Sequence, residues 1–272
     1  MPRVSVIIGI YNCASTLREA LDSLFSQTFQ DFDIILCDDG SNDGTFEVAS
    51  QYAEKHNNII LLHNQTNLGL NVTLNRCLSN ATGEFIARMD GDDVSLPDRF
   101  EKEVSFLDAH PEYAIVSTPM LYFDEDGVFG RGVAGGYEPD IKTLEKGSPF
   151  CHAPSMVRKI AFDRVNGYSE SRFLIRYEDY DLWTRMFKAG FRGFVLPECL
   201  YAMRDDRNAF SRRGIKVRIN GIYAHYLAYR SLPLSFSSFL KYSIRVIILG
   251  LLPRSVYTKL HKNKMSKRFL IS

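Results

Sequence analysis

Residues 4–41 read VSVIIGIYNCASTLREALDSLFSQTFQDFDIILCDDGS, and this stretch sets a pattern that the next eighty residues repeat. Val4–Ile10 and Phe32–Cys37 are short apolar runs of the kind that form buried strands. Between them, apolar residues recur at helical spacing, and Thr16 with Glu19 has the spacing of a capping box. A strand, a helix and a second strand joined by short loops predict a β-α-β unit with parallel strands.

The same alternation continues to about residue 120. Helical patterns and strand-like runs follow one another at residues 45–55, 59–62, 70–78 and 84–89. This order predicts an α/β fold, in which a mostly parallel sheet is flanked by helices. Ligands of such sheets bind beyond the carboxyl ends of the strands. The residues that follow each strand are therefore the first candidates for a functional site.

Polar and acidic residues follow three of the predicted strands. They are Tyr11-Asn12, Asp38-Asp39 and Asp90-Gly91-Asp92-Asp93. Clustered carboxylates suit a hard divalent cation, Mg²⁺ or Mn²⁺, which can bridge the oxygens of a nucleotide diphosphate. A solvated acidic turn is the alternative for either acidic cluster taken alone. The chain has neither G-x-G-x-x-G after the first strand nor G-x-x-x-x-G-K-[ST], so a metal is expected to offset the phosphate charge.

A third acidic cluster opens the helical pattern that ends near Ala189. Its carboxylates are Glu178, Asp179 and Asp181. One interpretation is capping, because the helix dipole stabilises acids at an N-terminus. The other is a sugar site, with a carboxylate that accepts a proton and an amphipathic wall formed by Tyr177, Tyr180 and Trp183. Weaker single candidates for phosphate or acceptor contacts are His152, Arg204, Arg207, Arg212 and Arg213.

Composition excludes several classes of protein. Of the 272 residues, 45% are hydrophobic and 24% charged, which are globular values and not those of disordered, collagen-like or coiled-coil chains. Five scattered cysteines without a C-x-x-C pair indicate a reducing compartment, with neither disulfides nor a zinc cluster. The first residues lack the length and cleavage site of a secretory signal. We therefore expect a cytoplasmic protein.

Charge is distributed unevenly along the chain. The net charge is +1, but residues 207–272 contain fourteen Lys and Arg and no Asp or Glu, which leaves −13 for the rest. We expect a catalytic domain over residues 1–210 and a basic, amphipathic helical region over residues 211–272. Such a basic region would meet an anionic surface, either a membrane or a polyanion.

The C-terminal region also carries a predicted amphipathic helix. Its apolar side consists of Phe236, Phe239, Leu240, Ile244, Ile247, Ile248 and Leu251. The uninterrupted apolar run Val246–Leu252 is far shorter than the ~20 residues that span a bilayer. One prediction is a helix on an anionic membrane surface, and the alternative is an apolar side that packs on the catalytic domain or a partner subunit. Nucleic acid is not expected as a partner, because the apolar residues form a packing face.

Together these motifs resemble the inverting glycosyltransferases of family 2, which have the GT-A fold. The resemblance covers roughly residues 2–205. It rests on Val4-Ser5-Val6-Ile7-Ile8 with Tyr11-Asn12, Ser26-Gln27-Thr28-Phe29, Asp38-Asp39-Gly40-Ser41, Asn67-Leu68-Gly69, Arg88-Met89-Asp90-Gly91-Asp92-Asp93, Leu96-Pro97-Asp98-Arg99 and Glu178-Asp179-Tyr180-Asp181-Leu182-Trp183. No Q-x-x-R-W follows the last motif, which argues against processive synthases of the cellulose or hyaluronan type.

The resemblance implies a role for each matching residue. Tyr11, Asp39, Arg88 and Asp90 would bind the nucleotide part of the donor. Asp92, together with Asp90, would coordinate Mn²⁺ or Mg²⁺. Asp179 would act as the base that deprotonates the acceptor, and Glu178 or Asp181 would orient it.

The implied activity is inverting transfer of one sugar from a nucleotide-diphosphate donor, a UDP-hexose or UDP-N-acetylhexosamine. The acceptor would be a hydroxyl of a glycan or lipid-linked oligosaccharide in bacterial O-antigen or capsule synthesis, at the cytoplasmic face of the inner membrane. A nucleotidyltransferase is disfavoured, because a Gly-rich phosphate loop with Lys or Arg is absent near the N-terminus. A non-catalytic nucleotide-sugar-binding or scaffold subunit of a polysaccharide assembly is the other alternative.

Overall fold

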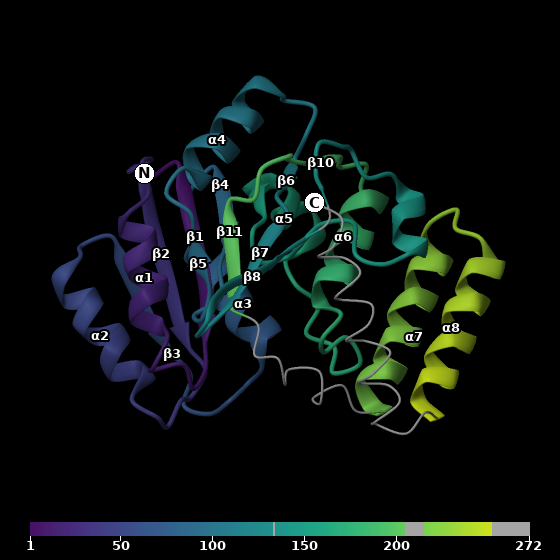
Figure 1. Ribbon diagram of the computed structural model, residues 1–272, viewed down its shortest axis with the longest axis horizontal. Coiled ribbons are helices and arrows are strands. Elements are labelled where there is room, and N and C mark those ends of the chain that lie inside the picture. Colours follow the sequence, from purple (N-terminus) through teal and green to yellow (C-terminus); the bar gives the residue numbers. More distant parts are fainter. Residues whose placement is uncertain (133, 205–214, 252–272) are drawn as a thin grey trace.

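The computed structural model describes residues 1–132, 134–204 and 215–251, and its centre is a seven-stranded sheet (Figure 1). In spatial order the strands are β10 (Gly193–Val195), β6 (Ile115–Ser117), β9 (Met156–Arg158), β4 (Phe85–Arg88), β1 (Val4–Ile10), β2 (Phe32–Asp38) and β3 (Ile59–His63). Neighbouring strands are parallel except at β9, which is antiparallel to both β4 and β6. The prediction of an α/β fold with a mostly parallel sheet is confirmed.

Helices cover both faces of this sheet. The helices packed on one face are α1 (Leu17–Phe25), α2 (Thr45–Lys55) and α4 (Arg99–Ala109). Those on the other are α3 (Leu70–Leu78), α5 (Lys159–Val165) and α6 (Glu178–Lys188). Successive side chains of a strand point to opposite faces, so Ile8 packs under the first group and Ile7 under the second. Burial on both faces explains why the strand sequences are continuously apolar.

The register of the strands brings their carboxyl ends to one edge. Ile10 at the end of β1 lies opposite Asp38 at the end of β2, and Asp38 lies opposite His63. On the other side of β1, Ile7 lies opposite Arg88, the last residue of β4. The polar residues that follow these strands therefore start from the same edge of the sheet.

A second, four-stranded sheet adjoins this edge. Its order is β5 (Val94–Ser95), β11 (Tyr201–Arg204), β7 (Met120–Asp124) and β8 (Gly127–Arg131). β7 and β8 form an antiparallel hairpin. β5 directly follows the acidic residues 90–93 and pairs with β11, so this acidic loop is fixed between β4 and β11.

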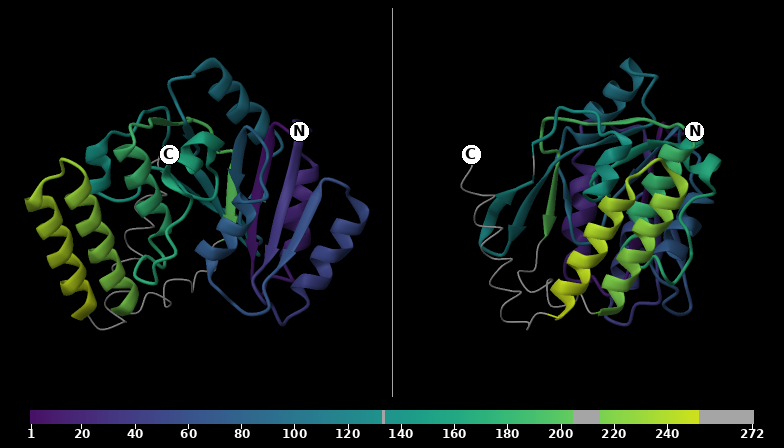
Figure 2. Two further views of the ribbon diagram at one scale, coloured as in Figure 1. Left: turned by 180° about the vertical axis from the view of Figure 1, so that it is seen from behind. Right: turned by 90° about the vertical axis from the view of Figure 1, so that its right-hand side faces the viewer.

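The described part of the C-terminal region, residues 215–251, contains two antiparallel helices, α7 (Ile215–Ser231) and α8 (Phe236–Leu251). They lie side by side at the end of the molecule away from β2 and β3 (Figures 1 and 2). α7 contacts α6 and the short helix η1 (Ile141–Glu145), and α8 contacts α7 and η1. The predicted domain boundary at residue 210 lies outside the described residues. In the part of the chain that the structure describes, every helix is too short or too polar to cross a membrane.

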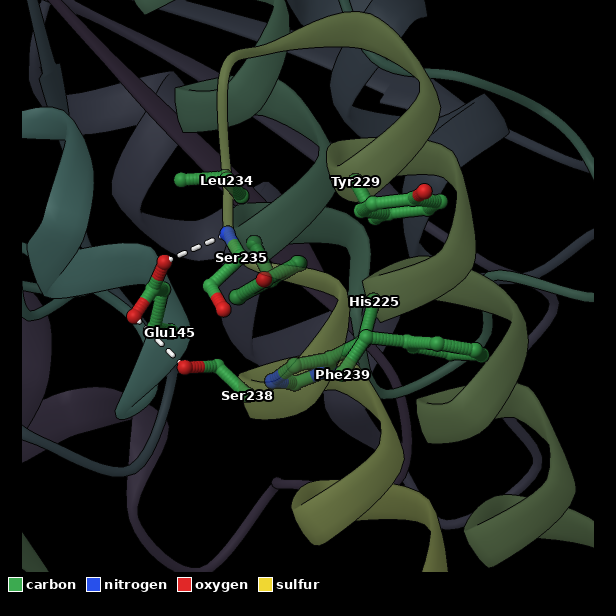
Figure 3. A pocket seen from close by; sticks show the side chains of 8 residues that line it. Glu145, His225, Tyr229, Leu234, Ser235, Ser238 and Phe239 are labelled. Carbon is green, nitrogen blue, oxygen red and sulfur yellow. Dashed lines mark hydrogen bonds between the residues drawn. The ribbon is translucent and has the colours of Figure 1, made fainter.

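Side-chain contacts join this helix pair to the catalytic domain (Figure 3). The Glu145 carboxylate accepts hydrogen bonds from the Ser235 backbone N–H (2.8 Å) and the Ser238 hydroxyl (2.7 Å), at the start of α8. The His225 ring of α7 stacks on the Tyr180 ring of α6, with 4.3 Å between centroids. The start of α8 and the middle of α7 are thus held against η1 and α6.

The capping box predicted for α1 is wrong. Thr16 has helical backbone angles (φ −113°, ψ −23°), whereas a capping residue is extended, and its side chain makes no capping bond. Its hydroxyl instead donates to the carbonyls of Cys13 (3.2 Å) and Gly91 (3.1 Å). Glu19, the other half of the expected box, pairs with Arg204. Both residues thereby connect α1 to the region of the acidic loop.

Candidate active site

The loop after β1 is bonded to the loop after β2. The Asn12 backbone N–H donates to the Ser41 hydroxyl (3.0 Å), and Asn12 Oδ1 accepts from the Asn42 N–H (3.0 Å). Asn12 has a φ of 50°, a left-handed conformation that asparagine tolerates better than most residues. Tyr11, at the strand end, is 47% exposed. Its ring is available to a ligand, as the predicted nucleotide contact requires.

Asp39, the other predicted nucleoside ligand, is buried and heavily bonded. Its Oδ1 accepts from Asn64 Nδ2 (2.7 Å) and the Leu68 N–H (2.8 Å), and its Oδ2 accepts from the Gly69 N–H (2.9 Å). A carboxylate oxygen can accept two hydrogen bonds, so Oδ2 retains one position for a nucleoside donor. The neighbouring Asp38 is fully buried, and its Oδ2 accepts from the Ser41 N–H (3.1 Å) and lies 3.0 Å from His63 Nδ1. Asp39 is therefore the better placed of the two for a ligand.

Arg88, at the end of β4, forms a two-pronged ion pair with Asp90. The arginine side chain is 6% exposed and the aspartate 34%. A bidentate pair of this kind fixes the orientation of both groups. The structure therefore brings Arg88 and Asp90 together, and the arginine engages both oxygens of the Asp90 carboxylate.

Asp93, to which the sequence assigned no role of its own, holds the acidic loop to β11. Its Oδ2 accepts from the Tyr201 hydroxyl (2.9 Å) and its Oδ1 from the Arg204 N–H (2.8 Å). Burial, together with the charges of Asp90 and Asp92, raises the pKa of Asp93 to about 8. The three carboxylates thus lie close enough to oppose one another's ionisation.

The buried Arg99 contacts residues on either side of the acidic loop, Arg88 and Tyr201. Arg99 Nη2 donates to the Arg88 carbonyl (3.0 Å), and its guanidinium carbon lies 5.1 Å from the centre of the Tyr201 ring. Its Nε pairs with Glu103 (3.1 Å), and both side chains are fully buried. Burial raises the pKa of Glu103 to about 7, against the opposing attraction of Arg99. The sequence pattern of α4 gave no signal that Arg99 points inward.

The acidic loop fits a divalent cation. Asp90, Asp92 and Asp93 each place a carboxylate oxygen within 4.8 Å of the others. Asp90 and Asp93 accept hydrogen bonds from other residues, whereas Asp92 is exposed, and no other residue in the described part of the chain donates a hydrogen bond to its carboxylate. Mg²⁺ and Mn²⁺ sites of phosphate-binding proteins commonly use one or two carboxylates plus the phosphates of the substrate. Asp92 is therefore the best placed ligand.

Glu178 and Asp179 begin α6 and have few partners. Asp179 Oδ2 accepts from the Ser148 hydroxyl (2.9 Å). Burial raises the pKa of both carboxyls, and the charge of Asp179 raises that of Glu178 further, while the charge of Arg88 opposes both increases. A carboxylate with a raised pKa is suited to accept a proton. Sequence reasoning missed Ser148, because nothing in its Gly-rich segment indicates that it faces α6.

Tyr168 and His152 lie near both acidic clusters. His152 Nε2 is 2.8 Å from the Tyr168 hydroxyl, so this histidine is hydrogen-bonded within the protein. Burial and the charge of Arg88 lower the pKa of His152 well below its usual value and keep the ring neutral. Burial raises the pKa of Tyr168, Arg88 lowers it, and Glu178 and Asp179 raise it. One phenol thus interacts with the charges of both clusters.

Several side chains of α6 other than those of Glu178 and Asp179 are buried. Asp181 pairs with Arg185 (2.7 Å), which also donates to two carbonyls at the end of α5. Trp183 and Tyr180 are 1% and 2% exposed, and Trp183 packs edge-on against Phe150. The prediction that Tyr180 and Trp183 form a sugar-binding wall is therefore wrong. Both rings pack inside the protein, Trp183 against Phe150 and Tyr180 against His225 of α7.

Of the arginines considered as diphosphate ligands, Arg204 lies beside the acidic loop. Its Nε donates to the Asp92 carbonyl (3.1 Å), and its guanidinium carbon is 4.5 Å from the centre of the Phe123 ring. It also pairs with Glu19, so protein groups already hold it. The other three, Arg207, Arg212 and Arg213, lie outside the described residues.

The chain is similar to known proteins over most of its length. Residues 5–166 match the family model of glycosyl transferase family 2. The chain is 44% identical to the Bacillus subtilis glycosyltransferase EpsE, over 97% of this chain and 95% of that one. It is 30% identical to an Escherichia coli UDP-Gal:alpha-D-GlcNAc-diphosphoundecaprenol beta-1,3-galactosyltransferase, over 99% and 98%.

The fold also matches solved glycosyltransferase structures. One is the mannosyltransferase PcManGT of Pyrobaculum calidifontis, solved with GDP-Man and Mn²⁺, which superposes with a TM-score of 0.66 at 20% identity over 85% of this chain and 66% of that one. The expectation of a GT-A fold is confirmed. With the family match across more than half of its length, the chain is a glycosyltransferase that belongs to glycosyl transferase family 2.

Proposed function

We propose that the protein transfers one sugar from a UDP-hexose or UDP-N-acetylhexosamine to an acceptor hydroxyl, with inversion at the anomeric carbon. The observation that carries this proposal is the pairing of two unlike acidic clusters near Tyr168. The loop at Asp90–Asp93 is anchored by protein donors, whereas Glu178 and Asp179 have raised pKa values and few partners. The UDP-Gal donor named for the Escherichia coli relative supports a uridine nucleotide.

Donor binding is assigned to the strand ends. Tyr11 and the free position on Asp39 Oδ2 would hold the nucleoside, and Arg88 with Asp90 would face the ribose and diphosphate. Asp92, with Asp90, would coordinate Mn²⁺ or Mg²⁺, and the Mn²⁺ in the mannosyltransferase structure supports this. The cation, when bound, offsets the charge that develops on the departing diphosphate.

Asp179 is proposed as the base. It takes the acceptor hydroxyl's proton as the hydroxyl oxygen attacks the anomeric carbon, and the bond from that carbon to the diphosphate oxygen breaks with its electron pair left on UDP. One in-line displacement of this kind needs only one base. Ser148 donates to one oxygen of Asp179, and the other oxygen would accept the proton of the acceptor. Glu178, beside it, and Asp181, through its pair with Arg185, would orient the base.

The acceptor is proposed to be a glycan or lipid-linked oligosaccharide of O-antigen or capsule synthesis. The diphosphoundecaprenol acceptor named for the Escherichia coli relative supports the lipid-linked class. Such acceptors lie in a membrane, so residues 1–210 would carry out transfer at its cytoplasmic face. The basic residues 211–272 would then contact the anionic membrane surface.

A screen of nucleotide sugars for thermal stabilisation tests the donor part of the proposal. A ligand that binds only the native state raises the melting temperature. We expect UDP and one or more UDP-sugars to raise it with Mn²⁺ present, and expect a much smaller effect in EDTA or in Asp92→Asn. No stabilisation by any uridine nucleotide, or equal stabilisation in EDTA, would contradict the proposal.

A further inference from the structure

We propose that the segment 172–176, together with the outward sides of α7 and α8, forms a docking face for an anionic lipid bilayer. This inference rests on the proposed function, because a lipid-linked acceptor lies in such a bilayer. It goes further by assigning a second segment, next to the proposed base, and by specifying which side of the helix pair meets the lipid. These three elements together form the docking face.

The outward side of α8 is apolar. Leu240, Ile244, Ile247 and Ile248 recur at helical spacing, and each is between 45% and 55% exposed. The opposite side of the helix packs inward, where the Tyr242 ring stacks on His225 of α7 at 3.4 Å. The alternative prediction, that this apolar side covers the catalytic domain, is therefore wrong for these four residues. A row of exposed aliphatic side chains this long marks an interaction site.

Further exposed apolar side chains lie on the segment 172–176 and on α7, the helix that packs beside α8. Phe173 and Ile175 are each 50% exposed, and Ile219 of α7 is 58% exposed. The Phe173 ring meets the Tyr223 ring edge to face, with 5.8 Å between centroids. Asn220 Nδ2, also on α7, donates to the Ile175 carbonyl (3.2 Å). These contacts join the segment to α7.

Cations surround this apolar surface. Arg172 and Arg176 flank the exposed residues of the segment, and Lys241 and Arg245 lie on α8 beside the isoleucines. The sequence has no acidic residue at positions 171–176 or 207–272. Apolar side chains that enter the interface and cations that meet anionic headgroups are the two requirements for binding such a bilayer.

The charges argue against a second copy of the chain on this face. A two-fold pairing brings the same patch of both copies together. The cations of the docking face would then meet like charges, which is unfavourable. An anionic bilayer satisfies both the apolar and the basic side chains. We therefore assign the bilayer as the partner.

The docking face is coupled directly to the proposed base. Tyr177 stands between the segment and Glu178, and its hydroxyl is 3.1 Å from the Tyr242 hydroxyl of α8. A Cβ at Gly221 of α7 would come within 2.4 Å of the Tyr177 hydroxyl oxygen, so this glycine permits the close approach. Docking would therefore hold the start of α6, and with it Asp179, near the lipid headgroups.

Vesicle flotation of the full chain tests the inference. The probe is a phosphatidylcholine vesicle with about one third phosphatidylglycerol, compared with phosphatidylcholine alone at low and high salt. We expect binding to the anionic vesicle at low salt and a loss of about 10- to 100-fold in the partition coefficient for I244S/I248S and for F173S/I175S. The matched control is V128S, on β8, where an equally apolar side chain is 63% exposed outside the docking face.

A spectroscopic measurement locates the contact. Trp183 is 1% exposed, so a tryptophan introduced by I247W is the exposed emitter and should be quenched by brominated lipids. Wild-type protein that does not float with anionic vesicles, or I244S/I248S that floats equally well, would overturn the inference. The inference would also be overturned if wild-type protein sedimented as a dimer and I244S/I248S sedimented as a monomer.

The same variants separate this inference from the proposed function. We expect I244S/I248S to retain stabilisation by UDP with Mn²⁺, because the nucleotide residues lie at the strand ends. If the wild-type protein responds to UDP but does not bind vesicles, only the docking face is overturned. Vesicle binding without any UDP response would contradict the proposed transfer and leave the docking face standing.

Discussion

Arginine, hydroxyl and backbone donors hold the acidic loop at Asp90–Asp93 in place. Among the described residues, by contrast, the carboxylates of Glu178 and Asp179 at the start of α6 have one side-chain hydrogen-bond donor between them, Ser148. The first cluster has charges fixed in position by Arg88, Tyr201 and the backbone of Arg204. The second has carboxyls whose pKa values are raised by burial. We infer that the first binds a charged group and the second exchanges a proton.

The largest expected effect tests the proton-exchanging cluster. Asp179→Asn keeps the size of the side chain but cannot accept a proton, so transfer should fall about 10²- to 10⁴-fold while UDP-sugar binding persists. The measurement is the transfer rate alongside a thermal-shift titration of the donor.

Asp181→Asn on the same helix is the matched control for this change. Asp181 pairs with Arg185, so its loss should lower the melting temperature and reduce the rate per folded molecule by less than about tenfold. Near wild-type turnover in Asp179→Asn would show that the base lies elsewhere, with Glu178 the next residue to test.

Asp92→Asn should reduce donor affinity by about 10- to 100-fold when Mn²⁺ is present, because the diphosphate charge is then less compensated. The protein should be at least as stable as wild type, since Asp92 is exposed and its negative charge opposes the ionisation of Asp93. Titration calorimetry with UDP in Mn²⁺ and in EDTA measures both. Full transfer in excess EDTA would exclude the metal from this cluster.

Tyr201→Phe should affect stability more than rate. The substitution removes the hydroxyl that donates a hydrogen bond to Asp93 Oδ2 (2.9 Å). We expect a loss of about 1 to 3 kcal/mol in the free energy of unfolding. The control is Tyr180→Phe, which removes a buried hydroxyl that donates to the Leu144 carbonyl (2.9 Å) away from the acidic loop. Only Tyr201→Phe should also weaken Mn²⁺-dependent UDP binding, and equal binding in the two variants would count against a metal site held by this loop.

The smallest effect is a shift in the pH profile. The Ser148 hydroxyl favours the charged form of Asp179 and lowers its pKa, so Ser148→Ala should raise that pKa. The base is then protonated at higher pH, and the acidic limb of the kcat/KM profile should move upward by about one unit or less. An unchanged limb would separate Asp179 from the group that titrates in the reaction.

Local patterns predicted most of the fold. The strands at Val4–Ile10 and Phe32–Asp38 are buried on both faces, so each is a continuous apolar run, and the helices between them show a clear apolar stripe. The position of β9, antiparallel between β4 and β6, could not be read, because it depends on pairing between strands about seventy residues apart.

The hydrogen-bond partners of the site residues could not be predicted from the sequence either. The motifs placed Asp90, Asp92 and Asp179 at strand and helix ends, where the structure has them. The contacts of Asp93 with Tyr201 and of Asp179 with Ser148 join distant parts of the chain and follow no local period. The prediction of a sugar-binding wall was wrong for a related reason. An aromatic residue on an amphipathic helix can pack in the core as readily as it can contact a ligand.

The central claim is that this chain moves a sugar from a uridine nucleotide, with binding and proton transfer divided between the two clusters. The direct test incubates the full chain with labelled UDP-sugars, Mn²⁺ and a bacterial lipid extract, and follows the label into the organic phase. We predict transfer of label by wild type, and little or none in EDTA, by Asp92→Asn or by Asp179→Asn. Donor that binds but never loses its sugar, in any of these mixtures, would contradict the account and favour a non-catalytic nucleotide-sugar-binding subunit.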